Sequence, residues 1–148
     1  MMYGILLLLH ILSATIWTGG HIILSVVLLP KILRERSPEI LLDFESRYER
    51  IGMPALVVQV ITGLFLVYHL VPDVSQWFNM ANPVSHLIAA KLILLVLTIG
   101  FAVDVKLRII PALSPDKLVA MAWHIIPVTI FSVLFVITGV SFRAGWLH

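Results

Sequence analysis

Hydrophobic residues fall into four long runs along this chain, separated by short polar stretches. The runs cover residues 5–29, 53–71, 84–103 and 118–140. Each supplies the roughly 20 apolar residues with which a helix crosses the ~30 Å hydrocarbon core of a bilayer. The pattern therefore predicts an all-α membrane protein, a single four-span transmembrane domain over residues 1–148. Because the connections are short, we expect an up-down-up-down bundle in which consecutive spans are neighbours.

The polar stretch between the first two runs carries a helix of its own. Ser37 is suited to be an N-cap, and Pro38 to be the first helical residue. Apolar side chains then recur on one face, opposite acids and arginines: Ile40, Leu41, Phe44 and Tyr48. We expect a short interfacial helix over residues 38–50 that leads into the second span.

Composition places the chain among membrane proteins independently of the pattern. The sequence is 60% hydrophobic and 12% charged, with a mean hydropathy of +1.05. A soluble domain of this size cannot bury so much apolar surface in one core. The first run lacks a basic segment before it and exceeds the roughly 7–15 apolar residues of a signal peptide, so we expect it to be retained as a helix.

Most basic residues lie at the same end of the predicted spans. One side of the predicted spans carries Lys31, Arg34, Arg36, Arg47, Arg50, Lys106, Arg108 and Lys117. Only Arg143 flanks the other side. The positive-inside rule then predicts a multi-pass membrane protein with both termini outside the cytoplasm, which is the periplasmic side if the membrane is a bacterial inner (cytoplasmic) one. The placement of the basic residues is explained by this topology, so the net charge of +2 does not indicate a nucleic-acid partner.

The chain contains no cysteine, which excludes intrachain disulfides, thiolate zinc sites and iron–sulfur clusters. A metal centre would have to use histidine, methionine or oxygen ligands. Histidines are the obvious candidates, because ionisable groups are costly in a bilayer and mark function there by default. Those within or at the ends of the spans are His10, His21, His69, His86 and His124.

These histidines fall into two layers. At ~1.5 Å rise per residue, His21 lies roughly 6 Å and His124 roughly 7 Å to the cytoplasmic side of their span midpoints. His10, His69 and His86 lie roughly 10–12 Å to the other side, near Lys91. The layers predict one pair formed by His21 and His124, and a second formed by His10 and His69. His86 and Lys91 would support or replace the second pair.

Two stacked imidazoles on one helix suit a two-haem bundle. His10 and His21 share a face of the first span, roughly 16 Å apart along its axis. Bis-His ligation of haem b, with one or two haems, would serve electron transfer or redox chemistry, and an oxidoreductase activity stays open. Gly19, Gly20 and Gly63 would leave room for a flat tetrapyrrole.

Plainer roles are open for the same residues. His21 could make an interhelical hydrogen bond to Ser, Thr or Gln59, and the glycines could allow close helix packing. His86 follows Asn82-Pro83 and suits a capping role. The terminal His148 suits neither a capping role nor a role as a metal ligand. Asp104 and Arg108, at i and i+4, predict an interfacial ion pair.

Copper is the competing metal. Met121 and His124 are three residues apart and share a helix face, and Met53 lies at a similar level of the second span. Imidazole with thioether is a ligand set that suits Cu(I). The alternative prediction is therefore a copper-binding protein of transport or resistance.

Three segments resemble the CopD (copper resistance protein D) family of bacterial inner-membrane proteins. They are "LLHILSATIWTGGHIILSVVLLP", "RYERIGMPALVVQVITG" and "NPVSHLIAAKLILLVL". The resemblance implies copper uptake or resistance and favours His10, His21 and His124 as metal contacts. The chain is also similar, more weakly, to HemJ-type protoporphyrinogen oxidases, in which His10, His86 and Lys91 would take the functional places.

Expected partners follow from these alternatives. The lipid bilayer surrounds the spans, and a quinol or a periplasmic redox or copper protein could exchange electrons or metal with the bundle. A homo-oligomer stays open.

Overall fold

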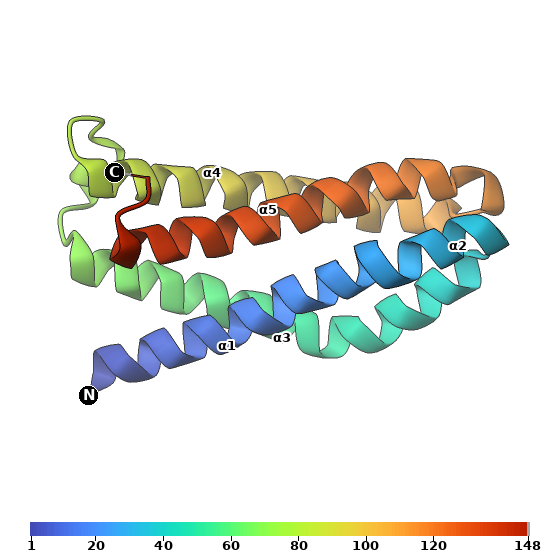
Figure 1. The fold of residues 1–148 in the computed structure, drawn as a ribbon, viewed down its shortest axis with the longest axis horizontal. Coiled ribbons are helices and arrows are strands. Elements are labelled where there is room, and N and C mark those ends of the chain that lie inside the picture. Colours follow the sequence, from blue (N-terminus) through green and yellow to red (C-terminus); the bar gives the residue numbers. More distant parts are fainter. Residues whose placement is uncertain (148) are drawn as a thin grey trace.

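Four long helical rods make up the computed structural model, which describes residues 1–147 (Figure 1). All four are long and apolar enough to cross a membrane, which confirms the predicted all-α, up-down-up-down membrane bundle. The N-terminus, the end of the last helix and the loop at 71–82 lie at one end, the terminal end (Figure 1). The turns at 36–37 and 110–117 lie at the other, which we call the basic end because most basic residues lie towards it.

The first rod contains a widened turn. It consists of α1 (Met2–Ile23), a π-helical segment (Leu24–Leu28) and α2 (Leu29–Glu35). The π-helical segment ends just before Pro30, which has no N–H to donate and whose ring crowds the carbonyl one turn back. A π turn relieves that crowding without ending the rod.

The third rod also contains a π-helical segment close to a proline. It consists of α4 (Pro83–Asp104), a π-helical segment (Val105–Ile109) and a 3-10 turn (Ile110–Ala112). Here the widened turn stands immediately before the 3-10 turn that contains Pro111. Both π segments lie towards the basic end of the bundle, where they shift the side chains that follow them.

The second rod is one helix, α3 (Pro38–Leu70). Ser37 occupies the N-cap position and Pro38 is the first residue, as the sequence predicted. The Ser37 hydroxyl makes no capping bond to the backbone and donates to the Glu39 carboxylate at 2.7 Å. The interfacial helix expected at 38–50 and the second span are thus a single continuous element. The chain reverses into it through Arg36, whose φ of 50° is left-handed.

The fourth rod is α5 (Leu118–Ala144), which follows a 3-10 turn at Pro115–Lys117. At the terminal end another 3-10 turn, η2 (Val74–Phe78), lies in the loop between α3 and α4. Asp73 and Asn82 cap the elements that follow them by accepting backbone N–H groups at 3.0 Å.

The hydrophobic core lies at the basic end. Ile32 and Leu41, from α2 and the start of α3, are 0% and 1% exposed. They belong to a cluster with Leu24, Leu29, Leu118, Met121, Ala122 and Ile125. These residues come from the first rod, α3 and α5, so the cluster holds these three rods together at the basic end.

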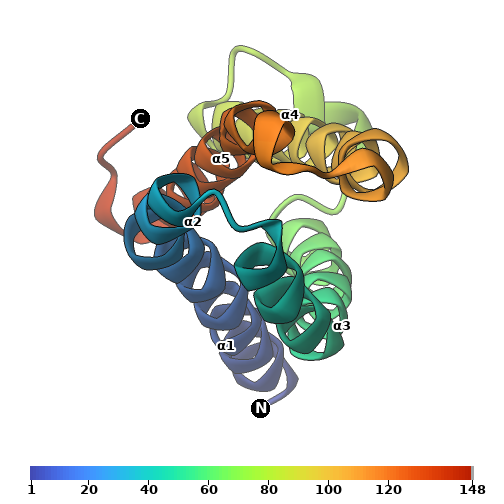
Figure 2. The same cartoon turned by 90° about the vertical axis from the view of Figure 1, so that its right-hand side faces the viewer.

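The rods pack as two hairpins. α1 packs against α3, α4 packs against α5, and α1 joins the hairpins through α5 (Figure 2). Within residues 1–147, α3 and α4 share almost no direct contact. The expectation that consecutive spans are neighbours therefore fails for this pair, and one side of the bundle is open.

Large apolar side chains cover the outside of the rods. Val26, Phe65 and Val96 are each more than half exposed at the middle of their helices. Such a surface is unfavourable in water and is solvated by acyl chains in a bilayer. The lipid bilayer is therefore a contact of this protein, as predicted.

Tyr48 fixes the approach of α3 to α1. Its ring lies against two glycines, Gly20 on α1 and Gly52 one turn further along α3. A Cβ on Gly52 would be 2.7 Å from the ring, and a Cβ on Gly20 would overlap it outright. The absence of side chains at these glycines is what lets the aromatic ring enter the interface.

Gly20→Ala should therefore destabilise the bundle, by about 1–3 kcal/mol, as overpacking does elsewhere. Gly19→Ala is the matched control, because nothing lies within 4 Å of a Cβ built there. The control should be neutral or slightly stabilising, since alanine favours helix. Thermal unfolding in detergent compares the two, and equal midpoints would contradict the packing role of Gly20.

Candidate functional site

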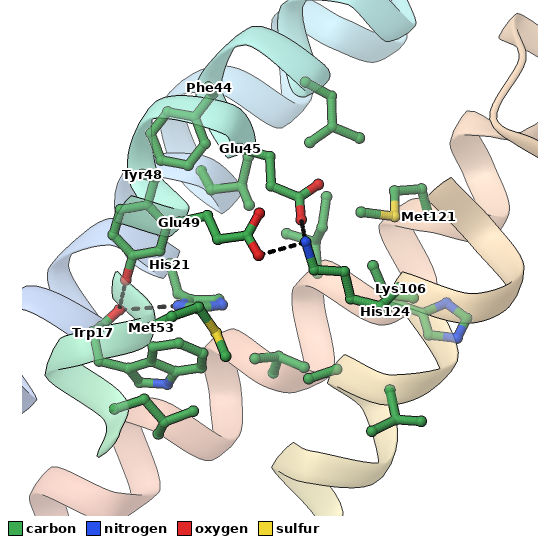
Figure 3. A pocket seen from close by; sticks show the side chains of 18 of the residues that line it. Trp17, His21, Phe44, Glu45, Tyr48, Glu49, Met53, Lys106, Met121 and His124 are labelled. Carbon is green, nitrogen blue, oxygen red and sulfur yellow. Dashed lines mark hydrogen bonds and ion pairs between the residues drawn. The ribbon is translucent and has the colours of Figure 1, made fainter. Parts of the chain in front are cut away.

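A cavity of about 410 Å³ lies in the half of the bundle nearer the basic end (Figure 3). All four rods line it, and its walls are mainly apolar and aromatic. The polar groups at its walls are His21, Glu45, Tyr48, Glu49, Lys106 and His124, and the two thioethers are those of Met53 and Met121. Apolar cavities with a few polar groups are the usual form of a ligand site.

His21 reaches the cavity from α1 in a fixed orientation. Its Nδ1 donates to the Trp17 carbonyl at 2.9 Å, and its ring lies 4.4 Å from the Trp17 ring and 5.9 Å from the Tyr48 ring. A neutral imidazole that donates from Nδ1 keeps its lone pair on Nε2. His21 thus offers one oriented acceptor nitrogen, held by a partner in its own helix.

His124 reaches the same cavity from α5, but both its ring nitrogens have partners. Nδ1 lies 2.9 Å from the Ala120 carbonyl, and Nε2 lies 2.8 Å from Asp104 Oδ2. Arg108 Nη1 donates to the other carboxylate oxygen at 3.1 Å, so the predicted Asp104–Arg108 pair is present. Sequence reasoning missed the bond to His124. The only signal for it was the similar level of the two residues on adjacent spans.

Met53 and Met121 face the cavity from α3 and α5 (Figure 3). Met121 is 4% exposed and belongs to the hydrophobic core, whereas Met53 is 43% exposed. The structure therefore brings together around one cavity His21, His124 and both methionines, which the sequence placed at one level.

A charged cluster bridges the open side of the bundle. Lys106 Nζ, on the π-helical segment after α4, lies 2.6 Å from Glu49 and 3.7 Å from Glu45 on α3. These ion pairs join two rods that otherwise hardly touch. The sequence analysis missed this cluster because it depends on how α3 faces α4, which no local pattern encodes.

His10 is an interhelical hydrogen-bonding group. Its Nδ1 lies 3.0 Å from the Gln59 carbonyl and 3.0 Å from Thr62 Oγ1, both on α3. A Cβ on Gly63 would be 3.1 Å from the His10 ring. Gly63 thus leaves room for the imidazole of His10 itself.

His10 and His69 are not brought together. The His69 ring lies 5.2 Å from Tyr3, which is seven residues, or ~10 Å of helix, before His10. His69 is likewise seven residues beyond Thr62, the partner of His10. Two axial ligands of one iron cannot lie that far apart.

The other residues predicted near this layer have local roles. His86 Nε2 donates to the Met80 carbonyl at 2.6 Å, within the loop that precedes α4. Lys91 Nζ lies close to Gly139, where a Cβ would be 3.2 Å away, and 5.7 Å from the centre of the Phe142 ring. His148 lies outside the described residues.

Two of the three predicted glycines, Gly20 and Gly63, give no clearance for a tetrapyrrole. Tyr48 fills the space beside Gly20, and His10 fills the space beside Gly63, while Gly19 faces open space. Within residues 1–147, no three His, Cys, Asp or Glu side chains form a metal-binding group.

Four spanning rods around a mainly apolar cavity define a polytopic integral membrane protein. The family model of CopD, copper resistance protein D, matches residues 42–142, which is more than half the chain. The chain therefore belongs to the CopD family and is a copper-resistance-related membrane protein. Neither a curated protein nor a solved structure matched it. The weaker similarity to HemJ-type protoporphyrinogen oxidases found no support.

Most of the residues that line the cavity fall within the matched range. Met53, Lys106, Met121 and His124 lie within it, whereas His21 lies on α1, before it begins. The family match thus covers three walls of the cavity, and the first rod supplies the fourth.

Asp104→Ala should expose His124 Nε2. Diethyl pyrocarbonate acylates an imidazole nitrogen that has a lone pair, so His124 should react several-fold faster in this variant than in the wild type. Arg108→Ala keeps the carboxylate and should react at nearly the wild-type rate. Peptide mass spectrometry measures both rates, and equal rates in all three proteins would contradict the bond.

Proposed function

We propose that the cavity at the basic end binds copper as Cu(I), and that the chain handles this ion as a substrate within the membrane. One observation carries the proposal: His21 Nε2 and the thioethers of Met53 and Met121 line the same cavity. Soft thioether sulfur and imidazole select Cu(I) over hard cations such as Mg²⁺.

The surroundings of His21 support a ligand role. Metal-binding histidines usually donate the other ring N–H to a carbonyl or carboxylate, which fixes the ring and its tautomer. The bond from His21 to the Trp17 carbonyl has this form. His124 would join as a further nitrogen ligand only after its bond to Asp104 opens.

Haem b fits these residues less well. Bis-His ligation through His10 and His69 needs two imidazoles at one level, and their contacts lie ~10 Å apart along the helices. Ligation through His21 and His124 would require breaking the Asp104 bond. The haem and electron-transfer predictions thus gain no support, and copper is the better proposal.

Copper titration of the purified protein tests the site. His21→Ala, and the double change Met53→Leu with Met121→Leu, should each weaken Cu(I) binding at least about tenfold. Leucine keeps the volume of methionine and removes the sulfur. Met80→Leu is the control, because Met80 lies in the exposed loop before α4. This variant should bind Cu(I) with the wild-type affinity.

Competition with a chelator of known Cu(I) affinity measures these constants. If the His21 variant and the double methionine variant bound Cu(I) as tightly as the wild type, the proposed copper site would be contradicted. A reducible Soret band in the purified protein would instead favour haem.

We further propose the orientation implied by the basic residues, with both termini periplasmic in a bacterial inner membrane. The cavity then lies in the cytoplasmic half of the membrane. A cysteine introduced at Trp77, in the loop at the terminal end, should react with an impermeant maleimide added to intact spheroplasts. One introduced at Ala112, at the basic end, should react only after lysis. The opposite result would reverse the orientation.

A further inference from the structure

We propose that the same cavity binds a lipid-soluble hydroquinone, an aromatic ring that carries hydroxyl groups and an apolar tail. One of its hydroxyls would donate a hydrogen bond to His21 Nε2. This inference rests on the shape and walls of the cavity. Because His21 Nε2 has a single lone pair, the hydroquinone and Cu(I) would occupy the site in turn and not together.

The size of the cavity points to an organic ligand. A single copper ion with its ligand atoms occupies a small part of about 410 Å³. Sites for small organic molecules typically measure about 300–1,000 Å³ and have mainly apolar walls. The cavity therefore has room for a ring and the first part of a tail.

The cavity opens towards the bilayer. Met53 on α3 and Ile99 and Val103 on α4 line it and are 43%, 47% and 49% exposed. These two helices hardly touch each other, so the opening lies between them. These three side chains are apolar, and the Lys106–Glu49 ion pair borders them towards the basic end. A ligand that enters past the apolar side chains comes from the hydrocarbon phase and must dissolve in it.

The inner wall matches an aromatic ring with a donor group. Trp17, Phe44 and Tyr48 provide aromatic surface, on which flat rings pack favourably (Figure 3). The Tyr48 hydroxyl already donates to the Ile16 and Trp17 carbonyls. His21 Nε2 is left as an acceptor, which selects a ligand with a hydroxyl over a plain acyl chain.

Binding of a reduced ubiquinone with a ten-carbon tail tests the inference. Calorimetry under nitrogen, with the full chain in lipid nanodiscs, should show saturable binding. The same molecule with both hydroxyls methylated should bind about tenfold more weakly to the wild type. His21→Ala should bind the two molecules equally, at the weaker affinity. His69→Ala is the control, since His69 lies outside the cavity, and should behave as the wild type.

Leu56→Trp provides a second variant that keeps His21 and fills the cavity, and it should abolish binding of both molecules. Absence of saturable binding to the wild type would overturn the proposal. Equal affinity of the wild type for the two molecules would do so as well, and would identify the occupant as an acyl chain.

Separate titrations distinguish this inference from the copper site. The hydroquinone is added to copper-free protein, and Cu(I) is added to protein without hydroquinone. Hydroquinone binding without copper binding in the wild type would reject only the proposed function, and the converse would reject only this inference.

Discussion

A single carbonyl oxygen, that of Trp17, organises the centre of this bundle. It accepts hydrogen bonds from His21 Nδ1 at 2.9 Å and from the Tyr48 hydroxyl at 3.0 Å. One bond orients the imidazole and the other holds α3 against α1. A carbonyl has two lone pairs, and in a bilayer no water competes for them. The wall of the cavity and the nitrogen that faces it therefore depend on the same atom.

Prolines shape the rods without ending them. Pro30 and Pro111 each follow a π-helical segment, and Pro54 and Pro127 lie inside α3 and α5. Proline removes a backbone hydrogen bond and is tolerated in spanning helices when nearby turns adjust. The widened turn before Pro111 carries Lys106, which is how the charged cluster comes to face α3.

The sequence was sufficient for features that depend on one helix at a time. The four spans, the Ser37 cap with Pro38, and the Asp104–Arg108 pair all follow from spacing within a single element, and all are present. His21 and His124, which their depths in the spans assign to one level, both line the cavity, and their pairing at one metal stays a prediction.

Features that depend on two helices were not predictable in the same way. His10 and His69 were assigned to one level from the midpoints of their apolar runs, but α3 begins at Pro38, 15 residues before the second run. The relative shift of two helices is set by interlocking side chains, such as Tyr48 between Gly20 and Gly52. Hydropathy does not record that shift, and the partner of His124 was missed for the same reason.

The missing contact between α3 and α4 has a mechanical consequence. The two hairpins are joined through α1 and α5 along one seam, with Thr18 donating to the Ser132 carbonyl at 3.4 Å. On the opposite side, the Lys106 ion pairs with Glu45 and Glu49, whose carboxylates are partly buried, are the polar links described between the hairpins. A change in the angle between the two hairpins would therefore disturb fewer contacts on the side of α3 and α4 than along the seam of α1 and α5.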